Sequence, residues 1–264
     1  MTMKLAKTIA IALTAVAGFA GTAMGAGAAK HPMQMEWSFE GPTGTYDLAS
    51  AQRGWQIYKN VCSACHSLKY FRFRNLAELG YEEDMIKAWA AEYTVVDGVD
   101  DAGDPKERNG LPQDAFPSPF PNPEAAAASN GGAVPPDLSL IAKARHDGPN
   151  YLYSLLTGYE DAPADHEAPA GKSYNPYFPG GNISMAPPLM EGIVEYEDGT
   201  AATEEQMAKD VVNFLMYVAE PKLEARHHMG LNVLLYLLVL VVVLYFSMKK
   251  IWKPVKEGKN FYKK

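Results

Sequence analysis

The stretch Cys62-Ser63-Ala64-Cys65-His66 holds the only two cysteines of the 264-residue chain, and a histidine directly follows the second one. The spacing C-x-x-C-H is the attachment signature of c-type haem. On a helical turn, the residues three and four positions after Cys62 lie on its own face. Two thiols can then bond the two vinyl groups at one porphyrin edge while the His66 imidazole reaches the iron. The motif predicts one covalent haem c.

Two other uses of a C-x-x-C pair are a redox dithiol and half of a zinc site. A zinc site needs further Cys or His ligands at suitable spacing, and the chain has no other cysteine. A thioredoxin-like dithiol does not need the following histidine and is typical of a βαβ context. Haem attachment is therefore the preferred interpretation.

Both ends of the chain have compositions typical of export and membrane insertion. Residues 1–28 start with two lysines, continue with an apolar run and end in small residues, as a cleaved secretory signal peptide does. An uncleaved anchor is the alternative, but the run is short and rich in Gly and Ala. Residues 229–248 are apolar, and at about 1.5 Å per residue they can cross a hydrocarbon core of roughly 30 Å. They predict a single transmembrane anchor.

Charge divides the chain into an acidic middle and a basic end. Residues 249–264 carry seven lysines and one acid, which marks this basic tail as cytoplasmic and the haem domain, residues 29–228, as periplasmic. The whole chain has a net charge of −7 and residues 1–28 carry +2, so residues 29–248 carry −15. Such a balance favours a basic protein partner and argues against nucleic acid. Simple solubility is the alternative explanation.

The haem domain is predicted to be all-α with long loops. Ser50 is the expected N-cap of a helix that leads into the haem motif, and Thr203-Glu204-Glu205-Gln206 is a capping box. Residues 94–132 are rich in Asp, Gly and Pro and predict an irregular excursion. The expected helices cover residues 51–58, 81–93, 135–146, 150–157 and 203–219.

The sixth iron ligand separates an electron carrier from a haem protein with an open catalytic site. Most of the twelve methionines fall in the signal, the anchor, the lead-in or a helix, which leaves Met185 and Met190. Met185 precedes Ala-Pro-Pro, whose backbone is rigid and non-helical, so it is the better candidate. A methionine packed on the core remains an alternative, and five histidines are competitors: His31, His146, His166, His227 and His228.

The haem motif and several further runs resemble the cytochrome c1 family, in order along nearly the whole mature chain. Arg53-Gly54 precedes the motif, and Met229-Gly230-Leu231 opens the anchor. Between them lie the runs Pro121-Asn122-Pro123-Glu124-Ala125-Ala126, Pro135-Pro136-Asp137-Leu138-Ser139, Ala144-Arg145-His146, Leu155-Leu156-Thr157-Gly158-Tyr159, Asn175-Pro176-Tyr177-Phe178-Pro179-Gly180, Met185-Ala186-Pro187-Pro188, Glu195-Tyr196-Glu197-Asp198-Gly199-Thr200 and Ala219-Glu220-Pro221.

The resemblance implies a c-type cytochrome core with long loop insertions and one C-terminal transmembrane helix. It implies that His66 is the proximal and Met185 the distal iron ligand of a haem held by two thioethers. It also implies that Arg145 pairs with a haem propionate, with Tyr151 near the same edge. The residues implied to pack on the haem are Pro135 and Pro136, either of which could supply a carbonyl that orients the His66 ring.

Some bacterial members of the family carry an extra cysteine pair near the loop before the distal methionine. This sequence has none, so packing and prolines alone are expected to hold that loop.

The implied role is that of the electron-carrying haem subunit of the cytochrome bc1 complex. This subunit is expected to have no catalytic residues of its own. Such a subunit passes electrons from the Rieske iron–sulfur protein to a soluble basic c-type cytochrome, beside cytochrome b, in the cell inner membrane. The alternatives are a membrane-anchored mono-haem subunit of another oxidase or dehydrogenase, and a catalytic or sensory haem protein with an open iron site.

Overall fold

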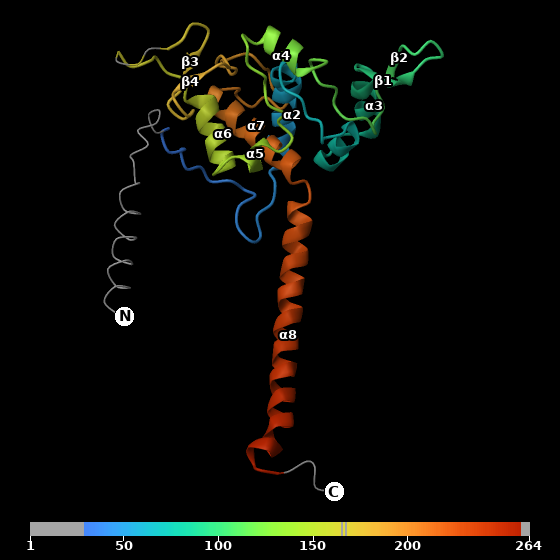
Figure 1. Cartoon of the computed structure of the whole chain (residues 1–264), viewed down its shortest axis with the longest axis vertical. Helices are drawn as coiled ribbons and strands as arrows, with labels where there is room; N and C mark the ends of the chain where they lie inside the picture. Colours follow the sequence, from blue (N-terminus) through green and yellow to red (C-terminus); the bar gives the residue numbers. More distant parts are fainter. Residues whose placement is uncertain (1–28, 165, 167, 260–264) are drawn as a thin grey trace, which may run out of the picture.

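The computed structural model describes residues 29–164, 166 and 168–259. The predicted signal peptide, residues 1–28, and the last five residues of the predicted tail lie outside this range. Figure 1 shows a head domain carried at one end of a single long helix, α8. The α-helices are α2 (Leu48–Asn60), α3 (Glu83–Ala91), α4 (Pro123–Ser129), α5 (Ile141–Ala144), α6 (Gly148–Thr157), α7 (Glu204–Ala219) and α8 (Leu223–Lys256).

The remaining regular elements are short. Two 3-10 helices cover Cys62–Ala64 and Phe73–Leu79, and the strands are β1 (Thr94–Val99), β2 (Pro105–Asn109), β3 (Ser173–Tyr174) and β4 (Asn182–Ile183). The strands form two antiparallel pairs, β1 with β2 and β3 with β4. The prediction of a helical haem domain with one long C-terminal helix is thus confirmed, with two small sheets in its loops.

Helices α2 and α7 cross closely in the centre of the head domain (Figure 1). A Cβ atom on Gly54 would lie 2.2 Å from the carbonyl oxygen of Asp210 and 2.6 Å from Cβ of Phe214, so only glycine fits at the crossing. Next to it, Arg53 Nε donates to the fully buried carboxylate of Asp210 at 2.8 Å. The aromatic core around the crossing includes Trp55, Tyr58, Phe71, Phe73 and Phe116. This core supports the end of α2, where the cysteine motif begins.

The helix starts show one correct and one wrong prediction. The Thr203 hydroxyl accepts a hydrogen bond from Gln206 N at 3.2 Å and caps α7, which is the first half of the predicted capping box, while Gln206 Nε2 donates to Asp210 Oδ1 instead. Helix α2 starts at Leu48, ahead of the predicted boundary, because Asp47 Oδ1 accepts from Ser50 N at 3.0 Å. Ser50, the predicted cap, is itself buried inside the first turns of α2.

Residues 94–132 are more regular than predicted. Strands β1 and β2 form a hairpin whose turn is closed by Asp100 Oδ1, which accepts from the backbone of Ala102 and Asp104. Arg108 fastens the hairpin by donating to Asp97 at 2.8 Å and to Asp114 at 2.6 Å. Helix α4 follows, capped by a side chain within the same stretch. Cross-strand pairing and ion pairs therefore give order to a segment whose composition suggests none.

The predicted helix over residues 135–146 is mostly wrong. Only Ile141–Ala144 is helical, and Pro135, Pro136 and Asp137 precede it without regular secondary structure. The reason is that Leu138 N donates to Ser67 O at 2.9 Å, so this segment pairs with the haem motif instead of coiling.

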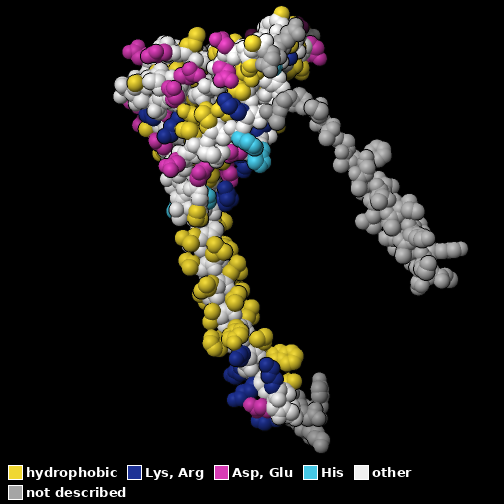
Figure 2. All heavy atoms as spheres, turned by 90° about the vertical axis from the view of Figure 1, so that its left-hand side faces the viewer, with side chains coloured by type: hydrophobic (Ala, Val, Ile, Leu, Met, Phe, Trp, Pro, Cys, Tyr) yellow, Lys and Arg dark blue, Asp and Glu magenta, His cyan; other side chains and the backbone are white. Residues whose placement is uncertain are grey.

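Helix α8 has 34 residues and a mean hydropathy of 2.5 in its most apolar window, and it is long and apolar enough to cross a membrane. It extends beyond the predicted span 229–248 at both ends. Figure 2 shows hydrophobic side chains along its middle and lysines gathered at its far end. Its first turns are fastened to the head domain: Glu224 accepts from Tyr46 N at 2.8 Å, and His227 Nδ1 lies 3.0 Å from Gly44 O.

Candidate haem site

The cysteine motif continues α2 as one tight turn. Cys62–Ala64 form a 3-10 helix, and Cys65 N and His66 N both donate to Cys62 O, at 3.1 and 2.8 Å. The two thiols are free rather than joined in a disulfide. Burial, with a smaller contribution from Cys65, raises the pKa of the Cys62 thiol to about 12. The turn thus presents two free thiols and an imidazole next to the buried core.

The His66 ring is oriented by the backbone of a distant segment. Its Nδ1 lies 2.8 Å from the carbonyl oxygen of Pro136. Because a carbonyl only accepts, Nδ1 carries the proton and Nε2 keeps a free lone pair. Burial lowers the pKa of His66, against the raising effects of the Pro136 hydrogen bond and of Asp137. A neutral imidazole with a free Nε2 is the form that binds iron.

The segment containing Pro136 is joined to the motif by further hydrogen bonds. Asp137 Oδ2 accepts from Ser67 Oγ at 2.7 Å and from Lys69 N at 2.9 Å, and its Oδ1 accepts from Ser139 N at 2.9 Å. Burial raises the pKa of Asp137, but these hydrogen bonds outweigh it, so the pKa lies below its ordinary value. The sequence did not predict a role for Asp137 in the site, although Asp137 lies in the family-like run Pro135-Pro136-Asp137-Leu138-Ser139.

Met185, the predicted distal ligand, is half-buried in the loop after β4. Its carbonyl oxygen accepts a hydrogen bond from the Tyr159 hydroxyl at 3.1 Å. Burial, and then the neighbouring Tyr151, raises the pKa of Tyr159. Burial also raises the pKa of Tyr151, against a lowering effect of the nearby Arg145. Tyr159 thus hydrogen-bonds to the Met185 backbone and has Tyr151 as a neighbour, and Tyr151 in turn has Arg145 as a neighbour.

The loop before Met185 is held by hydrogen bonds as well as by prolines. Strands β3 and β4 pair, Asn175 N donates to Gly181 O at 2.8 Å, and His166 Nε2 lies 2.9 Å from Asn182 Oδ1. The expectation that packing and prolines alone hold this loop was therefore incomplete. The missing contacts join residues 6 to 26 positions apart, with no local sequence pattern that marks the partners.

Arg145 is exposed, and within the described part of the chain its guanidinium donates only to Ala144 O, at 3.2 Å. Pro135 is half-buried and Pro136 exposed, and the flanking Val134 and Leu140 leave about half of their surfaces exposed (53% and 49%). The site thus combines two thiols, a neutral imidazole, a thioether, a cation and exposed apolar side chains. This donor set fits a covalently attached porphyrin with axial nitrogen and sulfur ligands.

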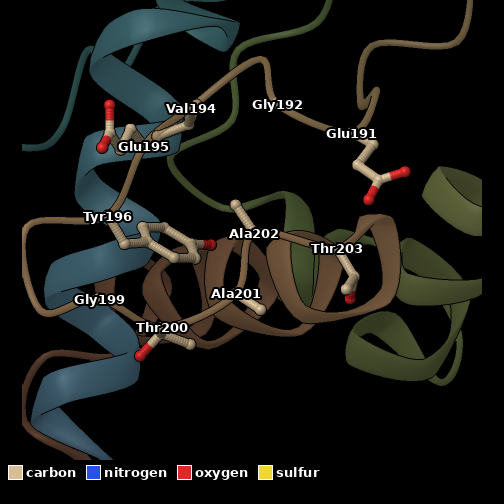
Figure 3. Close-up of a pocket in the computed structure, with 10 residues that line it drawn as sticks. All are labelled: Glu191, Gly192, Val194, Glu195, Tyr196, Gly199, Thr200, Ala201, Ala202 and Thr203. Atoms are coloured by element: carbon tan, nitrogen blue, oxygen red, sulfur yellow. The ribbon is translucent and has the colours of Figure 1, made fainter.

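A surface pocket of about 450 Å³ lies farther along the distal segment, between Glu191 and Thr203 (Figure 3). The buried ring of Tyr196 packs there between α2 and α7, with the Arg53 guanidinium 5.7 Å from its centre. None of the predicted haem residues lines this pocket. The pocket lies where the chain after Met190 packs against the core again, through the buried Tyr196.

Comparisons with known proteins agree with this geometry. The model of the Cytochrome C1 family matches residues 37–255. The chain belongs to the cytochrome c1 family. It is 48% identical to cytochrome c1 of Rhodospirillum rubrum, over 94% of this chain and 96% of that protein. It is 45% identical to the mitochondrial cytochrome c1 heme protein of Schizosaccharomyces pombe, over 92% of this chain and 81% of that protein.

A third relative, from Bradyrhizobium diazoefficiens, is named cytochrome b/c1. It is 44% identical over 94% of this chain, which covers 40% of that longer protein. The resemblance seen in the sequence motifs is thereby confirmed. As a cytochrome c1 family member, the chain is the electron-carrying haem subunit of the bc1 complex rather than an enzyme on its own, and α8 is its membrane anchor.

Proposed function

We propose that the chain holds one haem c through Cys62, Cys65, His66 and Met185, and carries electrons from a Rieske iron–sulfur protein to a soluble basic c-type cytochrome. The observation that supports this most directly is the hydrogen bond from His66 Nδ1 to Pro136 O, at 2.8 Å. It leaves Nε2 as the free ring nitrogen, one turn from two free thiols. When bound, the haem supplies a one-electron iron couple.

The protein's own residues fix and tune that group. Cys62 and Cys65 would form the two thioethers, each thiol adding across one vinyl group. Met185 would supply a thioether sulfur, which favours the reduced iron and closes the sixth position. Arg145 would pair with a propionate, and Pro135 and Pro136 would pack beside the ring. The neighbouring Tyr151 would line the same edge.

The remaining partners and the location are inferred from charge and from the relatives. The lysines at the far end of α8 (Figure 2) support a cytoplasmic tail and a periplasmic head in the cell inner membrane. The b/c1 relative supports cytochrome b as a neighbour of α8. The acids 97–104, on the β1–β2 hairpin, and 160–167, after α6, are candidates for steering a basic cytochrome, and residues 165 and 167 of the second group lie outside the described residues.

A ligand substitution with a matched control tests this proposal. Met185→Leu in the assembled complex is expected to keep covalent haem, lose the sulfur-to-iron charge-transfer band and lower the midpoint potential. Met190→Leu is the control, because Met190 lies in the same loop but is 60% exposed. An unchanged band in Met185→Leu would show that another residue holds the sixth position. Co-purification of cytochrome b and a Rieske protein tests the partners.

A further inference from the structure

The contact between the haem motif and the Pro-Pro-Asp segment is the densest link between distant parts of the candidate site. Besides the His66 bond to Pro136, four hydrogen bonds join residues 66–70 to residues 136–139. Ser67 Oγ and Lys69 N donate to Asp137, Leu138 N donates to Ser67 O, and Tyr70 N donates to Ser139 Oγ at 3.1 Å. These bonds fix residues 66–70 and residues 136–139, about 70 positions apart in the sequence, in one position relative to each other.

Asp137 is central to this link because its carboxylate contacts both sides. Oδ2 accepts hydrogen bonds from two donors that directly follow the haem motif, Ser67 Oγ and Lys69 N. Oδ1 accepts from Ser139 N, in the same segment as Asp137. Pro136 has neither an N–H nor a polar side chain, so it cannot hold its own carbonyl in place. The position of that carbonyl therefore depends on how residues 137–139 are held, and the Asp137 carboxylate accepts three of the hydrogen bonds that hold them.

We propose that Asp137 is a positioning residue for the proximal ligand: by holding the Pro136 carbonyl against His66 Nδ1, it sets the orientation and basicity of the imidazole. A hydrogen bond from Nδ1–H makes an imidazole a stronger donor to a metal through Nε2. A stronger donor favours ferric over ferrous iron, so this contact lowers the midpoint potential. The inference rests on the proposed role of His66 as proximal ligand.

The test compares four variants of the assembled complex by potentiometry and by the low-spin electron paramagnetic resonance spectrum of the haem. Asp137→Ala removes three hydrogen bonds and one charge. Asp137→Asn removes the charge and places an amide N–H₂ against at least one donor. Ser67→Ala removes one donor without changing any charge. Ser63→Ala is the matched control: its hydroxyl, in the turn after α2, donates to Lys59 O in the last turn of α2 at 2.7 Å and takes no part in the hydrogen bonds to residues 136–139.

The midpoint potential is expected to rise in Ser67→Ala, further in Asp137→Asn and most in Asp137→Ala, while Ser63→Ala matches the wild type. The spread of the low-spin signal should widen in the same order as the imidazole loses its fixed orientation. If the two Asp137 variants shift equally and Ser67→Ala matches Ser63→Ala, the effect is one of charge and the positioning role is wrong. Unchanged values in all four variants would also overturn it.

Two safeguards keep the result interpretable. If Asp137→Ala does not accumulate, the pair Ser67→Ala and Ser63→Ala decides by itself, since both substitutions are small and neutral. Failure of the proposed function is a separate outcome: the wild-type complex would then lack the low-spin spectrum of a histidine–methionine haem. Failure of the positioning role leaves that wild-type spectrum intact.

Discussion

The two sides of the candidate haem site are held in different ways. On the proximal side, five hydrogen bonds tie residues 66–70 to residues 136–139, and Tyr58 adds a sixth through its hydroxyl to His66 O at 3.0 Å. On the distal side, the β3–β4 pair and the His166–Asn182 contact hold the segment before Met185, but among the described residues only the Tyr159 hydroxyl bonds to Met185 itself, which is followed by two prolines. A net hydrogen bond contributes roughly 1 kcal/mol. The distal loop should therefore loosen first.

This difference agrees with the chemistry expected on each side. In the proposed site, His66 would lie beside two covalent attachments, and its ring orientation would affect the electron density at the iron. Met185 would be a weak ligand, and a loop with few interactions would release it without unfolding of the core. Local stability in proteins varies in this way between core elements and functional loops.

The largest effect is expected from a substitution that disrupts the packing of α2 on α7, which supports the proximal side. Gly54→Ala places a Cβ atom 2.2 Å from Asp210 O and should force α2 away from α7. Overpacking typically costs about 1–3 kcal/mol, and the upper end is expected here because main-chain atoms cannot move aside as a side-chain end can. Holoprotein yield and the thermal midpoint of the complex should both fall, and the proximal and distal sides should fail together.

The control for this prediction is Ala49→Val, which adds bulk to an exposed position on the same helix. Its cost should be about 0.5 kcal/mol, from helix propensity alone. Equal effects of the two substitutions would mean that the close crossing of α2 and α7 is not what supports the motif.

Tyr159→Phe should affect the distal side alone. It removes the hydroxyl that donates to Met185 O and leaves that carbonyl without its partner, at a cost of about 1 kcal/mol. The sulfur-to-iron charge-transfer band should then disappear at a lower denaturant concentration, before covalent haem or helical signal changes. Tyr70→Phe is the control, because Tyr70 is 76% exposed. A band as resistant as in the wild type would show that the prolines suffice.

The sequence predicted those parts of the site that depend on nearby residues. The spacing of Cys62, Cys65 and His66 needs one helical turn, the capping box at Thr203 needs four residues, and the anchor needs one uninterrupted apolar run. Each is a local pattern with a direct physical cause. The domain type followed from these patterns together with the family motifs.

The parts that were missed depend on specific pairs of residues, from 6 to 71 positions apart, that no local pattern identifies. Composition suggested a helix after Pro135, but Leu138 N donates to Ser67 O and the segment before Ile141 is not helical. The β1–β2 hairpin relies on Arg108 contacting two aspartates. The contact of Tyr159 with Met185 spans 26 residues. Such partners become visible only when the chain is folded, because many donors and acceptors could pair from sequence alone.

The smallest effect is expected at Glu220, which tests whether contacts with the membrane anchor α8 help to hold the proximal side in place. Glu220 accepts from Lys143 Nζ, on α5, at 2.9 Å and from Arg226 Nε, on α8, at 2.8 Å. Burial raises the pKa of Glu220, but its two cationic neighbours outweigh this and lower it. The stabilisation is therefore present above the ordinary carboxyl pKa and is lost as the pH falls through the lowered value.

Glu220→Gln should cost about 0.5–1 kcal/mol at neutral pH, since the lysine and arginine are largely exposed and solvent screens them. The difference in thermal midpoint from the wild type should shrink as the pH is lowered, because protonation of Glu220 has the same effect as the substitution. Glu83→Gln, in an exposed pair with Lys87 on α3, should change nothing measurable. If Glu220→Gln is equally silent, α5 and the proximal segment keep their position without any support from α8, and their rigidity comes from the head domain alone.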